Sequence, residues 1–489
     1  MDYSLSLVAL LLLVLGGTAL SRLLVTEQGM LGILETLSLG ILVGTGLVSI
    51  ALFALGQILA GLALRLSVAL ICLALPAMSL IIRPPRISGL IQPSAISPAK
   101  IIALTLLFAQ LCFVIWFVLN RGLGWDGIMV WEIKARLICL NNGVMPLGYF
   151  SDPTRRWSHP EYPLLLPMAE SWLYSWIGRC DQGLVKFIFP PFYLAAIGLL
   201  YVGSSKQGAQ GTLKFIAPLL MFFVPLVIVQ EGSISSGYAD YPLAVYYLGA
   251  VIYLLDYFRT KSSAALYAAS ALGALLPWVK TEGAILWFSL MVLQGLVATL
   301  RRELRPIIAM GLPGVCVILG WMLITRSAGA TSQDFYPFSP GVLWMNLSRS
   351  GTIFGSLGIE LLRASHWGVL WLGVAVVTLL NLFTSRNRLR YAHLILIVLP
   401  ITMYSLTYYF SRWNPVSLHI DSSLNRLLLQ PSLMAVLYVS IPVALGCHLR
   451  IGRAMKSSVD TENEDGGKLG AAGSSVQTAA PSGWPYYQH

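Results

Sequence analysis

Charged residues are scarce in this sequence, and that scarcity excludes an ordinary soluble protein. Only 11% of the 489 residues are Asp, Glu, Lys or Arg, whereas 56% are hydrophobic. A soluble domain carries roughly a quarter charged residues. Apolar runs long enough to cross a bilayer, about 20 residues each, recur along the chain. The sequence therefore predicts an all-α, polytopic integral membrane protein.

Other features are also missing. The first residues lack the basic segment and the cleavage pattern of a signal peptide, so we do not expect one. No spacing of cysteine and histidine suggests a zinc site, and pairing between Cys139 and Cys180 is left open. No internal repeat is obvious, which counts against transporters built from paired halves. The net charge of +11 does not indicate nucleic-acid binding, because the basic residues lie in short loops between apolar runs.

The apolar runs predict thirteen membrane spans, at about 4–21, 33–57, 59–82, 101–120, 183–203, 213–230, 241–258, 264–279, 283–299, 307–325, 366–383, 391–410 and 427–447. Residues 83–100 are predicted to form a linker, because they are rich in Pro and Ser. We divide the chain into N-terminal transmembrane helices (1–98), a transmembrane core (99–450) and a polar, Gly-rich tail (451–489) that we expect to be cytoplasmic and disordered.

Basic residues mark every second connection between these spans. The connections with this bias contain Arg83, Arg86, Lys100, Lys206, Lys214, Arg259, Lys261, Arg301, Arg302, Arg305, Arg386, Arg388, Arg390, Arg450, Arg453 and Lys456. By the positive-inside rule these connections are cytoplasmic. The other connections face outward and hold most of the acidic residues, so we expect any charged site on the outer face.

Two outer connections are long, 121–182 and 326–365. In the first, residues 124–167 concentrate ionisable side chains among Trp and Tyr, which indicates function in a membrane protein. Its apolar segment 162–177 is too short to cross and predicts a re-entrant or interfacial helix. In the second connection, apolar residues at roughly helical spacing predict a helix lying on the outer surface.

A helix over residues 125–140 would organise the first charged group. Glu132 and Arg136 would then form an i,i+4 ion pair. Asp126 and Lys134 would lie roughly 80° apart around the helix and about 12 Å apart along it, so that Lys134 could hold a phosphate while Asp126 faces the reacting bond. A simple salt bridge is the competing interpretation.

The other candidates have structural alternatives too. Asp240 opens a span at the outer face, where an acid also suits the helix dipole, and Lys280 and Glu282 form a tight outer turn, where snorkelling at span ends is the alternative. His159 and Glu161 stand in the motif SHPEYP, and a lone histidine is most often a structural hydrogen-bonder. His419 and Arg426 lie at the outer mouth of the last span, and Arg426 needs an anionic partner, for which a lipid phosphate is one candidate.

The order of these motifs resembles a known family. WDG-x-x-x-W-x-x-KAR, HPEYPLLLP, YADYPLA, VKTEG and H-x-D-x-S-x-x-R-L-L-L-Q follow one another between about residues 100 and 450. This order resembles the bacterial membrane glycosyltransferases of the GT-C superfold, relatives of the protein O-mannosyltransferases and of the aminoarabinose transferases that modify lipid A. The first three spans and the tail lie outside the resemblance.

The resemblance implies a GT-C-like core and an inverting hexosyl- or pentosyltransferase that uses a polyprenyl-phosphate sugar donor. It implies that Asp126 is the catalytic general base, that Lys134 and Arg426 bind the donor phosphate, and that Asp240 is a second outer acid. We add Glu132, His159, Glu161, Lys280, Glu282 and His419 as candidate sugar or acceptor contacts. Gly127 departs from the pattern, since many mannosyltransferases have an acid there, and this weakens the case for a protein-hydroxyl acceptor.

The expected partners are the lipid-linked donor, a glycan, lipid or protein acceptor, and membrane lipid. The expected location is the bacterial cytoplasmic membrane, with the site facing the periplasm. The sequence names no certain cofactor and leaves a divalent cation open. Two alternatives stay open as well: a transporter or flippase of lipid-linked sugars, and a ligase that transfers a whole glycan from a lipid diphosphate.

Overall fold

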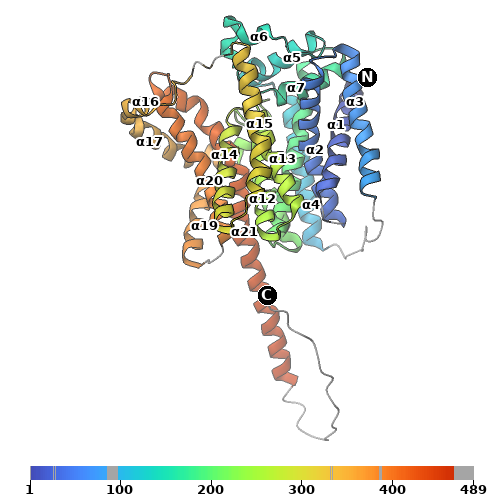
Figure 1. Ribbon diagram of the computed structural model, residues 1–489. Coiled ribbons are helices and arrows are strands. Elements are labelled where there is room, and N and C mark those ends of the chain that lie inside the picture. The colour runs from blue at the N-terminus through green and yellow to red at the C-terminus, as the bar shows by residue number, and fades with distance from the viewer. Residues whose placement is uncertain are drawn as a thin grey trace. The chain divides into compact units, whose positions relative to one another are not determined.

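The computed structural model describes residues 2–25, 27, 29–84, 97–330, 332, 334–384 and 388–466, and the described residues are almost entirely helical (Figure 1). The chain divides into two units, residues 1–442 and 443–489, and the description below concerns the first. An isolated antiparallel bridge between Phe335 and Ser411 is the β-type pairing found in the described part of the chain. The predicted all-α class is confirmed.

Among the described residues, ten helical stretches are long and apolar enough to cross a membrane: Asp2–Leu24 (α1), Gly29–Leu55 (α2), Gly61–Ile82 (α3), Pro98–Asn120 (α4), Gln182–Lys206 (α8, Gln182–Val185, to α9, Phe189–Lys206), Asp240–Thr260 (α12), Gly283–Arg301 (α14), Arg305–Ser327 (α15), Arg390–Phe410 (most of α20, Arg388–Thr407) and Val416–Ile441 (within α21, Val416–Gly466). Three shorter apolar stretches are Gly211–Met221, Ser263–Val279 (α13) and Leu370–Phe383 (in α19, Leu370–Thr384). Each overlaps one of the thirteen predicted spans. A polytopic membrane protein is therefore supported, while the count of thirteen crossings stays a prediction.

Two predicted boundaries differ from the structure. The predicted span 213–230 is interrupted, because α10 (Ile216–Met221) ends before Pro225, which begins the short α11 (Pro225–Ile228). The last helix begins at Val416, eleven residues before the predicted start at 427, although its first turns are polar. Part of the predicted linker, residues 85–96, and part of the predicted tail, residues 467–489, lie outside the described residues.

Small residues bring the first two helices into close contact. A Cβ atom on Gly17 would lie 1.9 Å from the carbonyl oxygen of Gly40, and one on Gly44 would lie 2.1 Å from that of Leu13. Membrane helices lack a hydrophobic driving force for association in lipid and depend on such close backbone packing. Glycine at these positions therefore lets α1 and α2 pack tightly.

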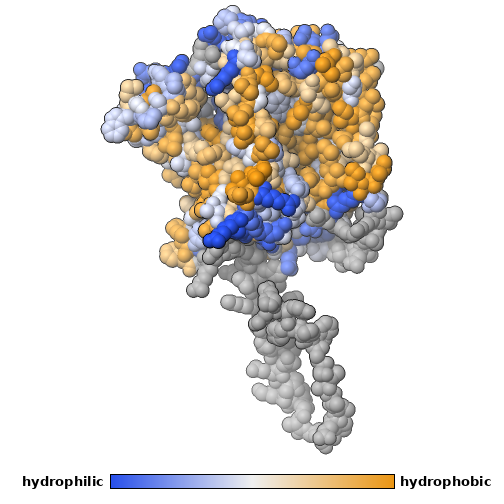
Figure 2. Space-filling model, in the orientation of Figure 1, coloured by the Kyte–Doolittle hydropathy of each residue, from blue (hydrophilic) through white to orange (hydrophobic). Residues whose placement is uncertain are grey.

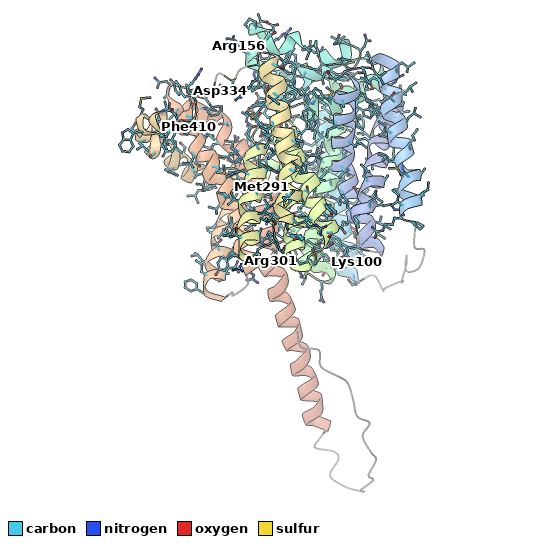
Figure 3. All side chains as sticks on the ribbon, in the orientation of Figure 1. Lys100, Arg156, Met291, Arg301, Asp334 and Phe410 are labelled. Atoms are coloured by element: carbon cyan, nitrogen blue, oxygen red, sulfur yellow. The ribbon has the colours of Figure 1, made fainter. Side chains whose placement is uncertain are left out.

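The charged residues lie toward two opposite ends of the helices. Figure 3 shows Arg156, Asp334 and Phe410 toward one end, and Lys100 and Arg301 toward the other. Figure 2 shows a broad hydrophobic band between two hydrophilic margins on the same face. Lys100 and Arg301, which the charge bias assigned to one side, therefore lie toward the same end. We call the end with Arg156 and Asp334 the site end; its orientation in a membrane stays a prediction.

Toward the opposite end, a buried ion network ties three helices together. Lys206 on α9 lies 3.2 Å from Glu35 on α2 and 2.8 Å from Asp256 on α12. The hydroxyl of Tyr253 donates a 2.8 Å hydrogen bond to Glu35. Because buried charges are costly unless paired, this network supports the packing of α2, α9 and α12.

Short helices form the site end. They are α5 (Ile133–Leu140), α6 (Gly148–Ser151), α7 (Leu165–Ile177), α16 (Pro340–Met345), α17 (Ser350–Leu361) and α18 (Ala364–Trp367). Helix α7 corresponds to the predicted short helix at 162–177, but nearly all of its residues are buried, so neighbouring helices cover it. Helices α16 and α17 confirm the helical part of the predicted outer connection 326–365.

Candidate functional site

Asp126 and Arg426 meet at the site end, although 300 residues separate them in the sequence. Asp126 lies at the start of the helical stretch that continues into α5, and Arg426 lies on α21. The Arg426 guanidinium donates to the Asp126 carboxylate, and its central carbon lies 5.4 Å from the centre of the Tyr238 ring. The side chains of Arg426 and Asp126 are only 17% and 28% exposed. The anionic partner that the sequence required for Arg426 is therefore Asp126.

The backbone that carries Asp126 fits closely against residues 236–238. The amide of Gly124 donates to the Ser236 carbonyl (2.8 Å), and the amide of Asp126 donates to the Tyr238 hydroxyl (3.1 Å). A Cβ atom on Gly127 would lie 2.4 Å from the Ser236 carbonyl oxygen. A second carboxylate directly after Asp126 would thus have no room on this backbone.

A second charged group lies where α12 begins and α13 ends. The Lys280 ammonium is 2.8 Å from Asp240 and 2.9 Å from Glu282, and the Lys280 and Asp240 side chains are 5% and 1% exposed. Gln430 of α21 donates a 3.1 Å hydrogen bond to Asp240. Burial lowers the pKa of Lys280, but Asp240 and Glu282 more than offset this effect, so the pKa lies above its ordinary value. Lys280 is consequently a cation at neutral pH.

The two groups act on each other electrostatically. Asp240 attracts Arg426 as well as Lys280, and the two cations repel each other. We call Asp126, Asp240, Lys280, Glu282 and Arg426 the charged cluster. Its formal charge is −1, from three carboxylates and two cations.

Several buried polar atoms in and beside the charged cluster have no protein partner. Among the described residues these include Asp240 Oδ2, Glu282 Oε2, Arg426 Nε and the neighbouring Glu161 Oε2. Buried polar atoms in native proteins are nearly always hydrogen-bonded to protein or water. The cluster therefore has both donor and acceptor capacity for polar groups that enter it.

Tyr162 connects this cluster to the motif around His159. Its ring stacks on the His159 ring (centroids 4.6 Å apart) and on the Trp131 ring (5.6 Å). The ammonium groups of Lys134 and Lys280 lie 5.6 Å and 5.8 Å from the Tyr162 centroid. The predicted motifs WDG-x-x-x-W, HPEYP and VKTEG thus meet around one aromatic ring.

Lys134 has a different environment from the other cations. It is completely buried, and its ammonium donates a 2.7 Å hydrogen bond to the carbonyl of His159. His159 itself has a left-handed backbone (φ 50°), so this hydrogen bond stabilises an unusual turn. The geometry gives Lys134 the role of holding the His159 turn, and the predicted contact with a phosphate stays a prediction.

Lys134 should make stability depend on pH. Burial lowers its pKa to about 7, although Glu161 acts in the opposite direction. The unfolded chain then binds more protons than the folded chain between about pH 7 and the ordinary lysine pKa of about 10.4, so stability should rise with pH across that window. Thermal unfolding of wild type and Lys134→Met in detergent at several pH values would check this. The difference in midpoint, wild type minus variant, should increase with pH, and a flat or falling difference would contradict a buried, pKa-lowered Lys134.

Asp334, an acid in the second outer connection, lies beside His159, which also contacts Glu161. His159 Nδ1 lies 3.2 Å from Glu161 and 3.6 Å from Asp334. Burial raises the pKa of Glu161, but the hydrogen bond and charge of His159 outweigh it and lower the pKa overall. Asp334 also accepts a 2.9 Å hydrogen bond from the Trp413 indole. Sequence reasoning missed Asp334, because an acid in an irregular loop carries no distinguishing pattern.

His419 lies beside the same loop. Its Nδ1 is 2.8 Å from the Ser411 hydroxyl, and its ring stacks on Trp413 at 5.1 Å. The side chain is largely buried. These contacts give His419 a structural hydrogen bond, and its predicted contact with a sugar or acceptor stays a prediction.

The Glu132 side chain makes its contacts outside the charged cluster. It forms the predicted i,i+4 ion pair with Arg136 (3.0 Å), accepts from the Tyr174 hydroxyl (2.7 Å), and is 3.3 Å from Gln182. These hydrogen bonds engage both carboxylate oxygens outside the charged cluster. Glu132 therefore fastens α5 to α7 and α8.

Cys139 and Cys180 come together near this junction. Both are free thiols. Burial is the main cause that raises the pKa of Cys139 to about 12, and a hydrogen bond with Cys180 adds to this effect. The pairing that the sequence left open is thus not formed in this structure. Within the described residues, no group of three or more His, Cys, Asp or Glu side chains is arranged to hold a metal ion.

Comparisons with protein-family models, with curated proteins and with solved structures find no match to this chain.

Proposed function

We propose that this protein is a membrane glycosyltransferase that moves a sugar from a polyprenyl-phosphate donor to an acceptor hydroxyl at the site end. The observation that carries the proposal is the pairing of Asp126 with Arg426 beside the buried Lys280. A phosphate-linked donor requires cations for its leaving group and a base for the acceptor, and the charged cluster offers both within one site. The order of the sequence motifs, which resembles that of membrane glycosyltransferases, also supports this proposal.

The reaction needs one bond to form and one to break. The acceptor oxygen attacks the anomeric carbon, the bond between that carbon and the phosphate oxygen breaks, and the acceptor proton passes to Asp126. The attack occurs opposite the leaving phosphate, so the configuration inverts. A positioned base contributes about 10²–10⁴-fold, and cations held in place stabilise the charge on the departing phosphate.

In this proposal Arg426 exchanges partners. It is paired with Asp126 in the structure, and its Nε has no hydrogen-bond partner within the described part of the chain. A donor phosphate would attract the guanidinium, which would weaken the hold on Asp126 and leave that carboxylate available as a base. Lys280 would supply a second cation, while Asp240 and Glu282 keep it charged and offer acceptors for sugar hydroxyls.

The remaining parts of the proposal follow from the membrane context. The apolar surface between the hydrophilic margins suits a polyprenyl chain (Figure 2), and the charge bias of the loops favours a site that faces the periplasm from the bacterial cytoplasmic membrane. The acceptor is a glycan, a lipid or a protein. His159, Glu161 and Asp334 are the proposed acceptor contacts, and Lys134 keeps their turn in place.

Donor binding by an Arg426→Gln variant tests the phosphate assignment. A charge-assisted hydrogen bond is worth about 1.5–3 kcal/mol, so the variant should bind a polyprenyl-phosphate sugar at least about tenfold more weakly than wild type. Binding would be measured with the purified full chain in detergent. The matched control is Arg363→Gln, which removes a half-exposed arginine paired with Glu360 and should leave affinity unchanged. Equal affinity in wild type and Arg426→Gln would contradict the assignment.

A further inference from the structure

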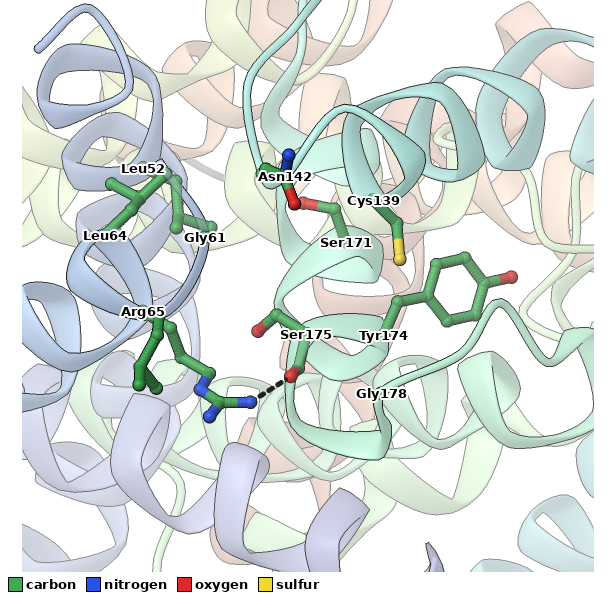
Figure 4. A pocket seen from close by; sticks show the side chains of 12 residues that line it. Leu52, Gly61, Leu64, Arg65, Cys139, Asn142, Ser171, Tyr174, Ser175 and Gly178 are labelled. Carbon is green, nitrogen blue, oxygen red and sulfur yellow. Dashed lines mark hydrogen bonds between the residues drawn. The ribbon is translucent and has the colours of Figure 1, made fainter. Parts of the chain in front are cut away.

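A separate pocket lies between the start of α3 and the helices α5 and α7. Its volume is about 250 Å³. Leu52, Gly61 and Arg65 line one side, and Cys139, Ser171 and Ser175 line the other (Figure 4). None of its lining residues belongs to the charged cluster. The pocket is also the place where α3, which the family resemblance does not cover, meets the short helices of the site end.

Arg65 is the one charged residue among the described residues that line this pocket. Its guanidinium donates a 2.5 Å hydrogen bond to the Ser175 carbonyl and lies 5.3 Å from the Trp176 ring centre. Arg65 Nε and the Trp176 indole nitrogen are both buried and have no hydrogen-bond acceptor among the described residues. None of the described residues that line the pocket is acidic, so the Arg65 guanidinium is the group that favours an anionic ligand.

The surface of α3 next to Arg65 is apolar and exposed. Four leucines follow one face of the helix: Leu62, Leu66, Leu70 and Leu73, which are 59%, 46%, 64% and 52% exposed. Their spacing of four, four and three residues keeps them on one stripe. Arg65 lies four residues from the start of α3, or about 6 Å along it, at the level where the apolar stripe begins. A lipid whose anionic group lies at Arg65 would therefore have an exposed apolar surface of α3 for its acyl chain.

We propose that this pocket binds the phosphate headgroup of an anionic membrane lipid, with an acyl chain lying along the leucine stripe of α3. The phosphate accepts hydrogen bonds from the Arg65 guanidinium, and the hydroxyl and amide groups of Ser171 and Asn142 border the headgroup. The site is separate from the proposed sugar-transfer site, and it gives the first three helices a role in holding lipid at the site end.

Native mass spectrometry of the full chain in detergent tests the proposal, with phosphatidylglycerol as the probe. Arg65→Gln should retain at least about fivefold less phosphatidylglycerol, the change expected for one interfacial arginine. Ser175→Phe, which fills the pocket and leaves Arg65 in place, should also lose the lipid. The matched control is Arg179→Gln, because Arg179 lies at the same end but pairs with Asp2 and Asp181; it should retain the lipid. Elution as a single folded species establishes that each variant is intact.

Three results would overturn the proposal. Equal retention of phosphatidylglycerol by wild type, Arg65→Gln and Ser175→Phe would remove the lipid from this pocket. Equal retention of diacylglycerol with the same chains would show that no phosphate is recognised. Displacement of the lipid by excess inorganic phosphate would identify a free anion as the ligand.

Discussion

Replacing Asp126 by asparagine is expected to slow sugar transfer by about 10²–10⁴-fold, the usual contribution of a positioned base. Donor binding should be preserved or become tighter, because Arg426 would no longer be held by a carboxylate and would be available to the phosphate. The two effects are separated by measuring single-turnover transfer and donor affinity on the same purified variant. A loss of transfer together with retained binding is specific to a catalytic role and differs from the effect of misfolding.

Asp421→Asn is the matched control for this variant. Asp421 is an exposed acid on the same helix as Arg426, and its replacement should leave both quantities unchanged. Asp126→Glu should recover part of the transfer rate, since it restores a carboxylate. Transfer by Asp126→Asn at the wild-type rate would contradict the assignment of Asp126 as the base.

Replacing Lys280 by methionine is expected to destabilise the protein by about 3–5 kcal/mol. Removing one partner of a buried ion pair leaves an uncompensated buried charge, and that loss has this magnitude. Lys280 and Asp240 are almost completely buried, and Glu282 shares the same cation. Thermal unfolding in detergent should show a large fall in the midpoint, and lower pH should reduce the deficit, because protonation neutralises the orphaned carboxylates.

Two further variants distinguish this explanation from a simple packing defect. Lys280→Met combined with Asp240→Asn should recover much of the lost stability, because the buried charge is removed as well. Lys261→Met removes an ion pair whose side chains are 42% and 41% exposed, and exposed pairs contribute only about 0–1 kcal/mol. Failure of the double variant to recover stability would contradict the charge argument.

Much of the fold could be predicted from the sequence, because it depends on local patterns. A bilayer forces each apolar run into a helix that satisfies its own backbone, and the helices lie close to the predicted ranges. The i,i+4 pair of Glu132 and Arg136 is equally local. The grouping of charged residues at one end could also be predicted, because the basic residues in alternate connections divide the chain into two sides.

Contacts between distant segments could not be predicted in this way. The pairing of Asp126 with Arg426 depends on how α21 packs against the stretch before α5, and no local pattern contains that information. The polar residues 417–426 resemble a loop, yet packing at the site end stabilises them as the first turns of α21. The hydrogen bond from Lys134 to the His159 carbonyl likewise joins two segments 25 residues apart, and its predicted contact with a phosphate stays a prediction.

Sealed proteoliposomes that contain the wild-type protein and a radiolabelled polyprenyl-phosphate sugar provide the most direct test of the proposed function. The proposal predicts that label leaves the lipid and appears on an added membrane-extract acceptor, and that Asp126→Asn prevents this transfer. Movement of intact labelled lipid between leaflets, without consumption of the donor, would contradict the transferase and indicate a flippase.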